Sequence, residues 1–347
     1  MRRPRPLLLL TAFPALLVAC GGGGGDDPGD GPDAAPIECT PQGDHKFVVD
    51  SLQIPTTAAQ AVTLYGLDID GKEGDTDQGI DNAVGRALAG LGEVDIDAPT
   101  AVAEAIDQGT IVLLANVRSE DLTNSSCAEI GVYLGDNDMI TPAACTDIND
   151  PATCRQHLDG NGSFVVDANS PADAILPGRI IGGAFSMRAA DAPGTIALEF
   201  PAIEGVPAIN IDLVAARVAV DQISDTGLMT GVIGGAVRVA DIENTLVPAL
   251  QMFVSDLIQT ECPTPTPGAC CPADSDAALA LTFLDADDNC AVTSEEIISN
   301  PTISVLLNAD VDLFDANDNY APNSDGENDS LSMGIGFTAV PASFDIP

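Results

Sequence analysis

The chain lacks tryptophan and carries few aromatic or basic side chains. Of its 347 residues, 4% are aromatic, and 12 Lys and Arg stand against 53 Asp and Glu, a formal net charge of −41. Nucleic-acid binding needs clustered Lys and Arg to neutralise phosphates, so this composition excludes nucleic acid as a partner. The hydrophobic fraction of 45% is ordinary for a folded protein, and the core is expected to consist of Ala, Val, Ile and Leu.

The residues and motifs that commonly carry catalysis are also scarce. The chain has two histidines, His45 and His157, which leaves little for a His-based triad or a zinc site. It contains no G-x-S-x-G, H-E-x-x-H or P-loop motif, and no G-x-G-x-x-G after a strand. With 53 acidic residues, a pair of carboxylates says almost nothing about glycosidase chemistry. We therefore expect that the protein is not an enzyme.

The amino-terminal end is typical of an export signal. Three arginines precede Leu7–Val18, an apolar run too short for an ordinary membrane-spanning helix. The residues Leu17–Cys20 (LVAC) resemble the lipobox of bacterial lipoproteins. The resemblance implies cleavage before Cys20 and a membrane anchor through lipidated Cys20. Gly21 in place of Asp favours the outer membrane of the cell envelope. The alternative is a plain secretory signal with a coincidental Cys.

Export would place the remaining cysteines in an oxidising compartment, where disulfides persist. Nine cysteines are present, and without Cys20 they form two groups of four: Cys39, Cys127, Cys145 and Cys154, then Cys262, Cys270, Cys271 and Cys290. We expect disulfides to close within each group and Cys290 to pair with Cys270 or Cys271. Neither group has the two-residue spacings of a tetrahedral zinc site.

The strongest chemical pattern is the stretch Asp285–Glu296 (DADDNCAVTSEE). Oxygen ligands fall where a twelve-residue calcium loop needs them, at Asp285, Asp287, Asn289, the Ala291 carbonyl, Thr293 and Glu296. The loop and its apolar flanks resemble the EF-hand family. The resemblance implies a bound calcium ion in a helix-loop-helix, with Thr293 acting through water and Glu296 as a bidentate ligand. The alternative is an acidic surface turn without metal.

Two departures separate this stretch from the family. Cys290 stands where the family has Gly, at a turn that requires a positive φ. A Cys there costs on the order of 1 kcal/mol unless a disulfide or a different loop geometry accommodates it. Pro301 would end the second helix early, which favours a structural calcium site over a helix pair that opens to bind a target.

A second acidic stretch runs from residue 67 to residue 82. It resembles the Asp- and Gly-rich calcium loops of thrombospondin-type and related bacterial surface repeats, and its candidate ligands are Asp68, Asp70, Asp75, Asp77 and Asp81. Its spacing does not fit a single EF-hand loop, because Lys72 takes the fifth position when Asp68 is the first. The alternatives are a solvated acidic turn and, for Asp81 and Asn82, a helix cap.

A third acidic stretch, residues 310–329, lies near the end of the chain. Its segment Asp315–Asn319 begins like an EF-hand loop, but Tyr320, Pro322 and Gly326 break the pattern. We interpret it as a degenerate loop that could complete a site with other loops. Salt adaptation is the alternative reading of all these acids, as a coat that holds water and counterions.

Apolar periodicity predicts an α+β fold with an antiparallel sheet or sandwich and flanking helices. Strands are expected at residues 46–49, 111–117, 179–187, 195–200, 208–213, 227–237 and 331–337. Helical spacing is found at residues 83–88, 100–107, 242–257 and 277–284. Residues 119–162 read as a disulfide-stapled excursion, and the tail at 331–337 is expected to pair into the sheet.

These patterns divide the chain into four parts. They are a signal peptide (1–19), lipidated Cys20 with a flexible tether (20–43), an α+β domain (44–260), and an EF-hand-like calcium region with a closing strand (261–347). The expected function is that of an exported, membrane-anchored lipoprotein that binds structural calcium and serves as a cell-surface structural or interaction protein. Its protein or polysaccharide partner is unidentified. The alternative is a carrier of lipid or other apolar cargo in the envelope.

Overall fold

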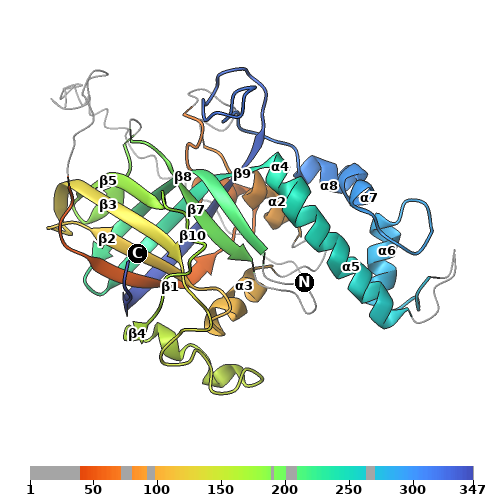
Figure 1. Cartoon of the computed structure of the whole chain (residues 1–347), viewed down its shortest axis with the longest axis horizontal. Helices are drawn as coiled ribbons and strands as arrows, with labels where there is room; N and C mark the ends of the chain where they lie inside the picture. The colour runs from red at the N-terminus through yellow and green to blue at the C-terminus, as the bar shows by residue number, and fades with distance from the viewer. Residues whose placement is uncertain are drawn as a thin grey trace, which may run out of the picture. The chain divides into compact units, whose positions relative to one another are not determined.

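Ten strands form one sheet in the computed structural model, which describes residues 40–71, 80–91, 98–188, 191–200, 209–262 and 270–346 (Figure 1). The strands are β1 (His45–Gln53), β2 (Leu113–Arg118), β3 (Asn124–Leu134), β4 (Gly162–Ser163), β5 (Ile175–Ile181), β6 (Ala184–Ser186), β7 (Gly194–Phe200), β8 (Ile209–Ser224), β9 (Gly227–Arg238) and β10 (Ser330–Ser343). All described residues belong to one unit that spans residues 38–347.

The sheet closes on itself. β1 pairs antiparallel with β2 along one edge and with β10 along the other, and the path β1-β2-β3-β5-β6-β8-β9-β10 joins the two ends. β7 adds to β8, and β4 adds parallel to β10. The predicted α+β class with an antiparallel sheet is confirmed, and the sheet is closed rather than a sandwich. The tail pairs into the sheet as predicted, as β10.

The core is a large cluster of buried aliphatic side chains with a few phenylalanines, including Phe47, Ile130, Leu176 and Phe185. β10 is buried from Ser330 to Phe337, on both faces, because a second layer of chain covers the outer face of this part of the sheet. Tyr65 lies so close to β10 that a side chain at Gly334 would meet its carbonyl oxygen at 1.9 Å. Glycines in these strands therefore permit close approach of the covering segment.

Helices flank the sheet. They are α1 (Ala58–Thr63), α2 (Ala83–Leu91), α3 (Ala98–Asp107), α4 (Val239–Asp241), α5 (Val247–Glu261), α6 (Asp276–Leu284), α7 (Ser294–Ser299) and α8 (Pro301–Leu306), with a π-helical segment at Ile242–Leu246. Figure 1 shows α5 to α8 grouped together at one side of the sheet. Within the described part of the chain, none of the helices has the length and apolar character needed to cross a membrane.

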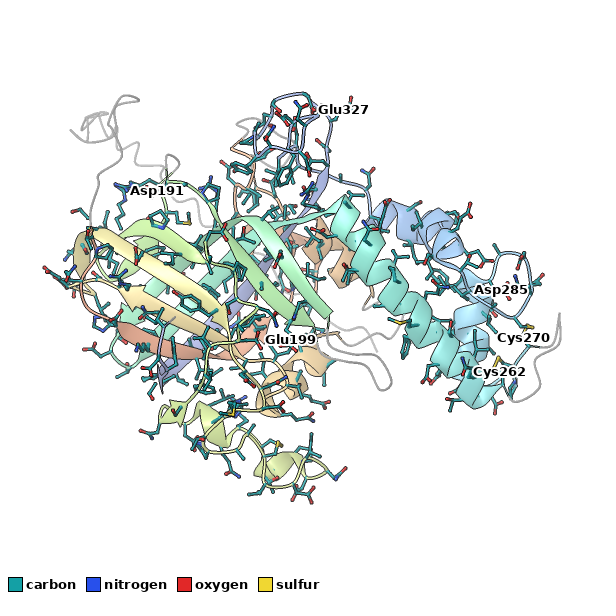
Figure 2. The ribbon with its side chains drawn as sticks, in the orientation of Figure 1. Asp191, Glu199, Cys262, Cys270, Asp285 and Glu327 are labelled. Carbon is teal, nitrogen blue, oxygen red and sulfur yellow. A yellow bond between two sulfur atoms is a disulfide. The ribbon has the colours of Figure 1, made fainter. Side chains whose placement is uncertain are left out.

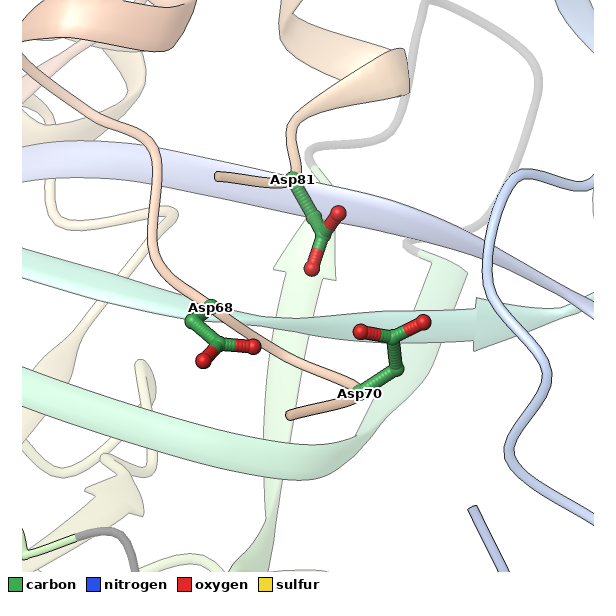
Figure 3. Close-up of side chains that lie close together, drawn as sticks. All are labelled: Asp68, Asp70 and Asp81. Atoms are coloured by element: carbon green, nitrogen blue, oxygen red, sulfur yellow. The ribbon is translucent and has the colours of Figure 1, made fainter. Parts of the chain in front are cut away.

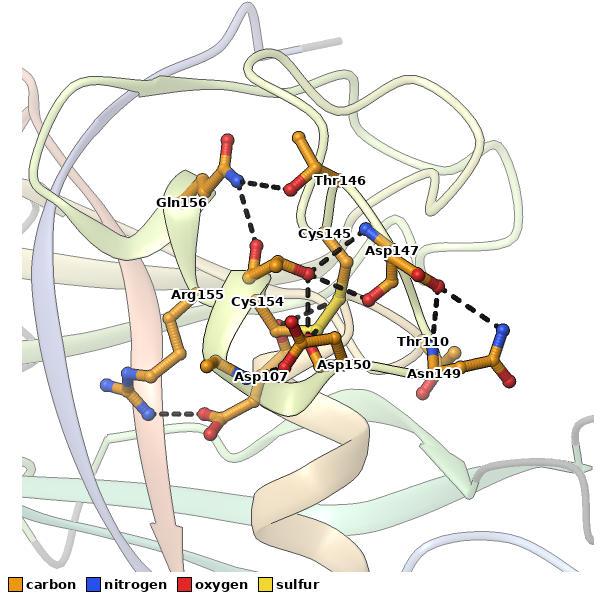
Figure 4. The surroundings of a disulfide bond; sticks show 12 residues. Asp107, Thr110, Cys145, Thr146, Asp147, Asn149, Asp150, Cys154, Arg155 and Gln156 are labelled. Carbon is orange, nitrogen blue, oxygen red and sulfur yellow. Dashed lines mark hydrogen bonds and ion pairs between the residues drawn. A yellow bond between two sulfur atoms is a disulfide. The ribbon is translucent and has the colours of Figure 1, made fainter.

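The prediction of a disulfide-stapled loop region at residues 119–162 is wrong for the first part of that range. Residues 124–134 form β3, because Ala128 and the run Ile130–Leu134 are apolar enough to be buried on both faces. The excursion begins after β3, where the disulfide Cys145–Cys154 staples it (Figure 4). An ion pair between Arg155 and Asp107 ties it to α3. The strand predicted at 179–187 is two strands, because Gly182 and Gly183 both adopt positive φ and turn the chain.

The second cysteine group closes within itself. Cys262 pairs with Cys271, and Cys270 pairs with Cys290, as predicted for Cys290. In the first group Cys145 pairs with Cys154, and Cys127 is also disulfide-bonded. Figure 2 shows Cys262, Cys270 and Asp285 together at the end of the helical group, far from Glu327. The two disulfides thus fasten the acidic Asp285 loop to the ends of α5 and α6.

Candidate metal centres

The first candidate centre lies between α6 and α7. α6 ends at Leu284, α7 begins at Ser294, and the connecting loop starts with Asp285. Carboxylate oxygens of Asp285, Asp287 and Glu296 lie within 4.8 Å of one another. Three negative charges in so small a volume repel one another, and oxygen ligands of this type are those that Ca²⁺ prefers. The donor chemistry therefore fits the predicted calcium ion.

Backbone donors hold the two outer carboxylates of this loop in place. Asp285 accepts hydrogen bonds from the Cys290 amide at 2.8 Å and the Asn289 amide at 3.1 Å. Glu296 forms a capping box with Thr293, whose amide and hydroxyl both donate to its carboxylate, at 2.9 and 2.8 Å. The Ala286 amide donates to its other oxygen at 3.1 Å. Both carboxylates are thus oriented toward the loop before any ion binds.

Cys290 adopts the conformation that glycine would normally supply. Its φ is +70°, in the left-handed region, and its sulfur is bonded to Cys270. The non-glycine residue costs on the order of 1 kcal/mol at this φ, and the disulfide offsets part of that strain by anchoring the turn. The positive φ predicted for this position is present.

The remaining predicted ligands of the loop have other partners in this structure. The Asn289 side-chain oxygen accepts a hydrogen bond from the Ala291 amide at 2.8 Å, and Thr293 is engaged with Glu296. Burial alone would raise the pKa of Glu296, but the hydrogen bonds from Thr293 and Ala286 outweigh it and lower the pKa below its usual value. Glu296 is therefore fully ionised at neutral pH and ready to bind a cation.

The second candidate centre is more buried. The carboxylates of Asp68, Asp70 and Asp81 converge from two chain segments and also lie within 4.8 Å of one another (Figure 3). Asp70 and Asp81 are 6% and 4% exposed. The predicted ligands Asp75 and Asp77 lie outside the described residues. Of the five candidates in this stretch, the structure thus brings three together.

Asp81 and its neighbour Asn82 have different roles. Burial raises the pKa of Asp81 to about 7; a hydrogen bond from the Ile69 amide opposes the shift, and the charges of Asp70, Asp310 and Asp68 add to it. Asn82 caps α2 by accepting from the Gly85 amide at 2.8 Å, and its side chain also bonds Gly334 of β10. The cap interpretation therefore holds for Asn82, while Asp81 faces the other carboxylates.

Two acids of the third acidic stretch, which were not among the predicted ligands, also belong to the surroundings of this centre. Asp310 accepts from the amide and hydroxyl of Ser332, at 2.8 and 2.6 Å, and its charge acts on Asp81. Asp312 is 1% exposed, and one of its carboxylate oxygens has no hydrogen-bond partner. The alternation Asp310-Val-Asp312-Leu, in which acids and apolar residues take turns, is the signal that could have singled them out.

Two surface hollows bear on the alternative of a carrier for apolar cargo. One of about 320 Å³ is lined by Asn169, Asn210, Ile211, Asp212, Asp241 and Thr245. Another of about 420 Å³ follows α5 and is lined by Pro248, Gln251, Met252, Ser255, Asp256 and Gln259. The walls of the first are mostly polar and those of the second are mixed, whereas apolar ligands are held by mostly apolar walls. Neither hollow supports the carrier alternative.

Comparison of the chain with protein-family models, with curated proteins and with solved structures found no match.

Proposed function

We propose that this chain is an exported, lipid-anchored protein whose Asp285–Glu296 loop binds a structural calcium ion in the manner of an EF-hand. The observation that carries the proposal is the convergence of Asp285, Asp287 and Glu296 between two helices, in a loop held by the Cys270–Cys290 disulfide. The ligands would be these three carboxylates with Asn289, the Ala291 carbonyl and, through water, Thr293.

The short helices favour a structural role for the ion over a signalling role. α7 ends at Ser299, and Pro301 starts the separate helix α8, so no long second helix is present to swing outward. Disulfides on both sides of α6 restrict its movement further. Calcium would neutralise the clustered carboxylates and lock the end of the helical group. Extracellular modules with such a role often bind calcium in the range of about 10⁻⁴–10⁻³ M.

The anchor and the location in the cell envelope are proposed from the sequence. The leader and Cys20 precede the described residues, and their support is the positive, apolar and lipobox pattern. Several acyl chains on Cys20 would give stable membrane attachment. Metabolic labelling with a radioactive fatty acid tests this directly. We expect label in the wild type and none in Cys20→Ser, while label retained in Cys20→Ser would contradict the anchor.

The calcium site is tested by thermal unfolding of the full chain with excess calcium and with EDTA. At a hundredfold excess over Kd, binding stabilises the folded state by about 2.7 kcal/mol. Glu296→Gln should reduce the calcium-dependent rise in Tm. The matched control is Glu295→Gln, which removes an adjacent exposed charge outside the cluster and should leave the rise unchanged. Equal responses in the two variants would contradict the proposal.

A further inference from the structure

Two loops on the outer face of the closed sheet are built on the same hydrogen-bond plan. In the first, the Leu67 carbonyl accepts from the Asp81 amide at 2.9 Å; in the second, the Val311 carbonyl accepts from the Asp329 amide at 3.0 Å. Each loop therefore closes between an apolar residue and a later aspartate. This pairs Leu67 with Val311 and Asp81 with Asp329.

The residues that follow in each loop keep the same correspondence. The Ile69 amide donates to the Asp81 carboxylate at 2.8 Å, and the Leu313 amide donates to that of Asp329 at 3.3 Å. Ile69 and Leu313 are buried in the same small apolar cluster. In each loop an aspartate carboxylate also accepts a hydrogen bond from a glycine amide. Asp68 accepts from the Gly71 amide at 2.7 Å, and Asp312 accepts from the Gly326 amide at 2.8 Å. Asp312 thus takes the place that Asp68 has in the first loop.

The two loops are also joined to each other. The Asn323 side chain donates to the Asp70 carbonyl at 2.8 Å, and the Asn323 amide donates to the Asp312 carbonyl at 3.0 Å. Tyr320 belongs to the second loop, and its ring packs edge-on against Phe314, which borders the apolar cluster that holds Ile69 and Leu313. The amino-terminal and carboxy-terminal acidic stretches therefore form one layer on the sheet.

Asp312, in the second loop, carries a buried carboxylate oxygen that no hydrogen bond satisfies. Its side chain is 99% buried, and its Oδ1 atom is out of contact with solvent and has no hydrogen-bond partner. An unpaired buried carboxylate oxygen is costly, and a cation is the partner that removes the cost most completely. Among the described residues, no Lys or Arg forms an ion pair with Asp312 or Asp81: Arg86 pairs with Asp310, and Arg238 pairs with Asp318.

We propose that the two loops form a paired site for hard divalent cations of the calcium class, distinct from the Asp285 loop. Asp68, Asp70 and Asp81 supply the carboxylates of the first loop, and Asp312 supplies the buried ligand of the second. A cation here ties the segment before α2 to the segment before β10, two parts of the chain more than 200 residues apart in sequence. Nothing in this site depends on the Asp285–Glu296 loop.

Terbium luminescence separates this site from the Asp285 loop. Tb³⁺ occupies calcium sites and emits when a nearby tyrosine is excited, and the chain has three tyrosines and no tryptophan. Tyr320 stands in the second loop of the paired site, whereas Asp285–Glu296 contains no tyrosine. Titration of the full chain with Tb³⁺ should give tyrosine-sensitised emission that calcium displaces, unchanged in Glu296→Gln and weakened in Tyr320→Phe.

Removal of the ligands then tests the pairing of the two loops. Asp81→Asn and Asp312→Asn should each weaken terbium affinity by about tenfold or more, since loss of even an outer-shell partner costs that much. Asp68 is exposed, so we expect Asp68→Asn to fold and to keep the test valid where a buried variant does not fold. Absence of sensitised emission, or affinity unchanged in Asp68→Asn or in folded Asp312→Asn, would overturn the proposal.

Discussion

The two candidate centres differ in how the chain assembles them. The Asp285 loop is contiguous: its carboxylates come from twelve successive residues, its turn is held by a nearby disulfide, and its ligands are exposed or half-buried. The paired site is assembled from segments at opposite ends of the sequence, and Asp81 and Asp312 are almost completely buried. The first site is a local structure attached to the fold, whereas the second is part of the fold.

This difference sets what each ion would stabilise. Neutralising the Asp285 loop should strengthen only the helical group around α6 and α7, because disulfides already limit how far that region can unfold. Neutralising the paired site should strengthen the whole closed sheet, because the covering layer contacts β10 and β9.

Asn82→Ala should damage the paired site and the sheet together. Asn82 is fully buried; it donates to the carbonyls of Ala61 and Gly334, at 3.0 and 2.9 Å, and accepts from the Gly334 amide at 3.0 Å. Each buried group left unpaired costs about 1–3 kcal/mol, so we expect a loss of about 3 kcal/mol or more in urea unfolding.

The control for this prediction is Asn137→Ala. Asn137 is exposed, its side chain makes one long hydrogen bond of 3.5 Å, and its loss should change stability by no more than about 0.5 kcal/mol. Folded Asn82→Ala should lose the tyrosine-sensitised terbium signal and keep the calcium response that Glu296 provides. Loss of both responses in folded protein would show that the two centres are not independent.

Replacing Cys270 and Cys290 together by serine should destabilise the Asp285–Glu296 loop and the helices beside it. The disulfide spans 20 residues, and its loss is expected to cost about 2–4 kcal/mol, concentrated in α6 and α7. Because the bond holds the Cys290 turn, the calcium-dependent rise in Tm should shrink as well. The matched control removes Cys145–Cys154, a disulfide remote from calcium ligands, and should leave that rise intact. An equal effect of both changes would contradict the local role of Cys270–Cys290.

The contiguous centre was accessible to sequence reasoning because its geometry is encoded by spacing. The positions of Asp285 and Glu296, the positive φ at Cys290 and its bond to Cys270 all follow from one short segment and one cysteine group. The closed sheet was predicted only as far as its class, because the pairing of β1 with β10 depends on contacts between the two ends of the chain. β3 was missed because its first residues, Asn124 to Cys127, are polar or small.

The paired centre was predicted only in its first half. Asp68, Asp70 and Asp81 stand in one acidic stretch, so composition drew attention to them. Asp312 stands in a stretch whose spacing from Asp315 onward is broken by Tyr320 and Pro322. The sequence therefore suggested that the stretch completes a site with other loops, but not which loop or through which residue. Packing in the folded protein decides which buried carboxylate lacks a hydrogen-bond partner. A periodic pattern in the sequence cannot predict this.

Backbone strain at Cys290 gives a smaller effect that belongs to the Asp285 loop alone. Two variants that lack the disulfide are compared: Cys270→Ser with Cys290→Gly, and Cys270→Ser with Cys290→Ser. Glycine adopts the observed φ of +70° without penalty, so the glycine variant should be more stable by about 1 kcal/mol. Chemical denaturation measures the difference. A more stable serine variant would mean that the turn does not keep this conformation once the disulfide is gone.

The smallest effect comes from a titrating group remote from both centres. His157 is 1% exposed, its Nδ1 has no partner, and its ring packs edge-on against Phe164. Burial lowers its pKa, and Arg155 lowers it further, while the hydrogen bond with Ile106 and the charges of Asp107 and Asp159 oppose the shift.

Because the pKa of His157 is lower in the folded state, its imidazole is neutral in both states above about pH 7. As the pH falls below about 6.5, His157 becomes protonated in the unfolded chain but stays neutral in the folded protein. The free energy of unfolding therefore decreases until the pH reaches the lowered pKa of the folded state. His157→Gln removes this proton uptake. It should cost stability at pH 7.5 through lost packing, but the gap from wild type should narrow between pH 7.5 and pH 5, as urea unfolding measures. A gap that stays constant would mean that His157 does not titrate differently on folding.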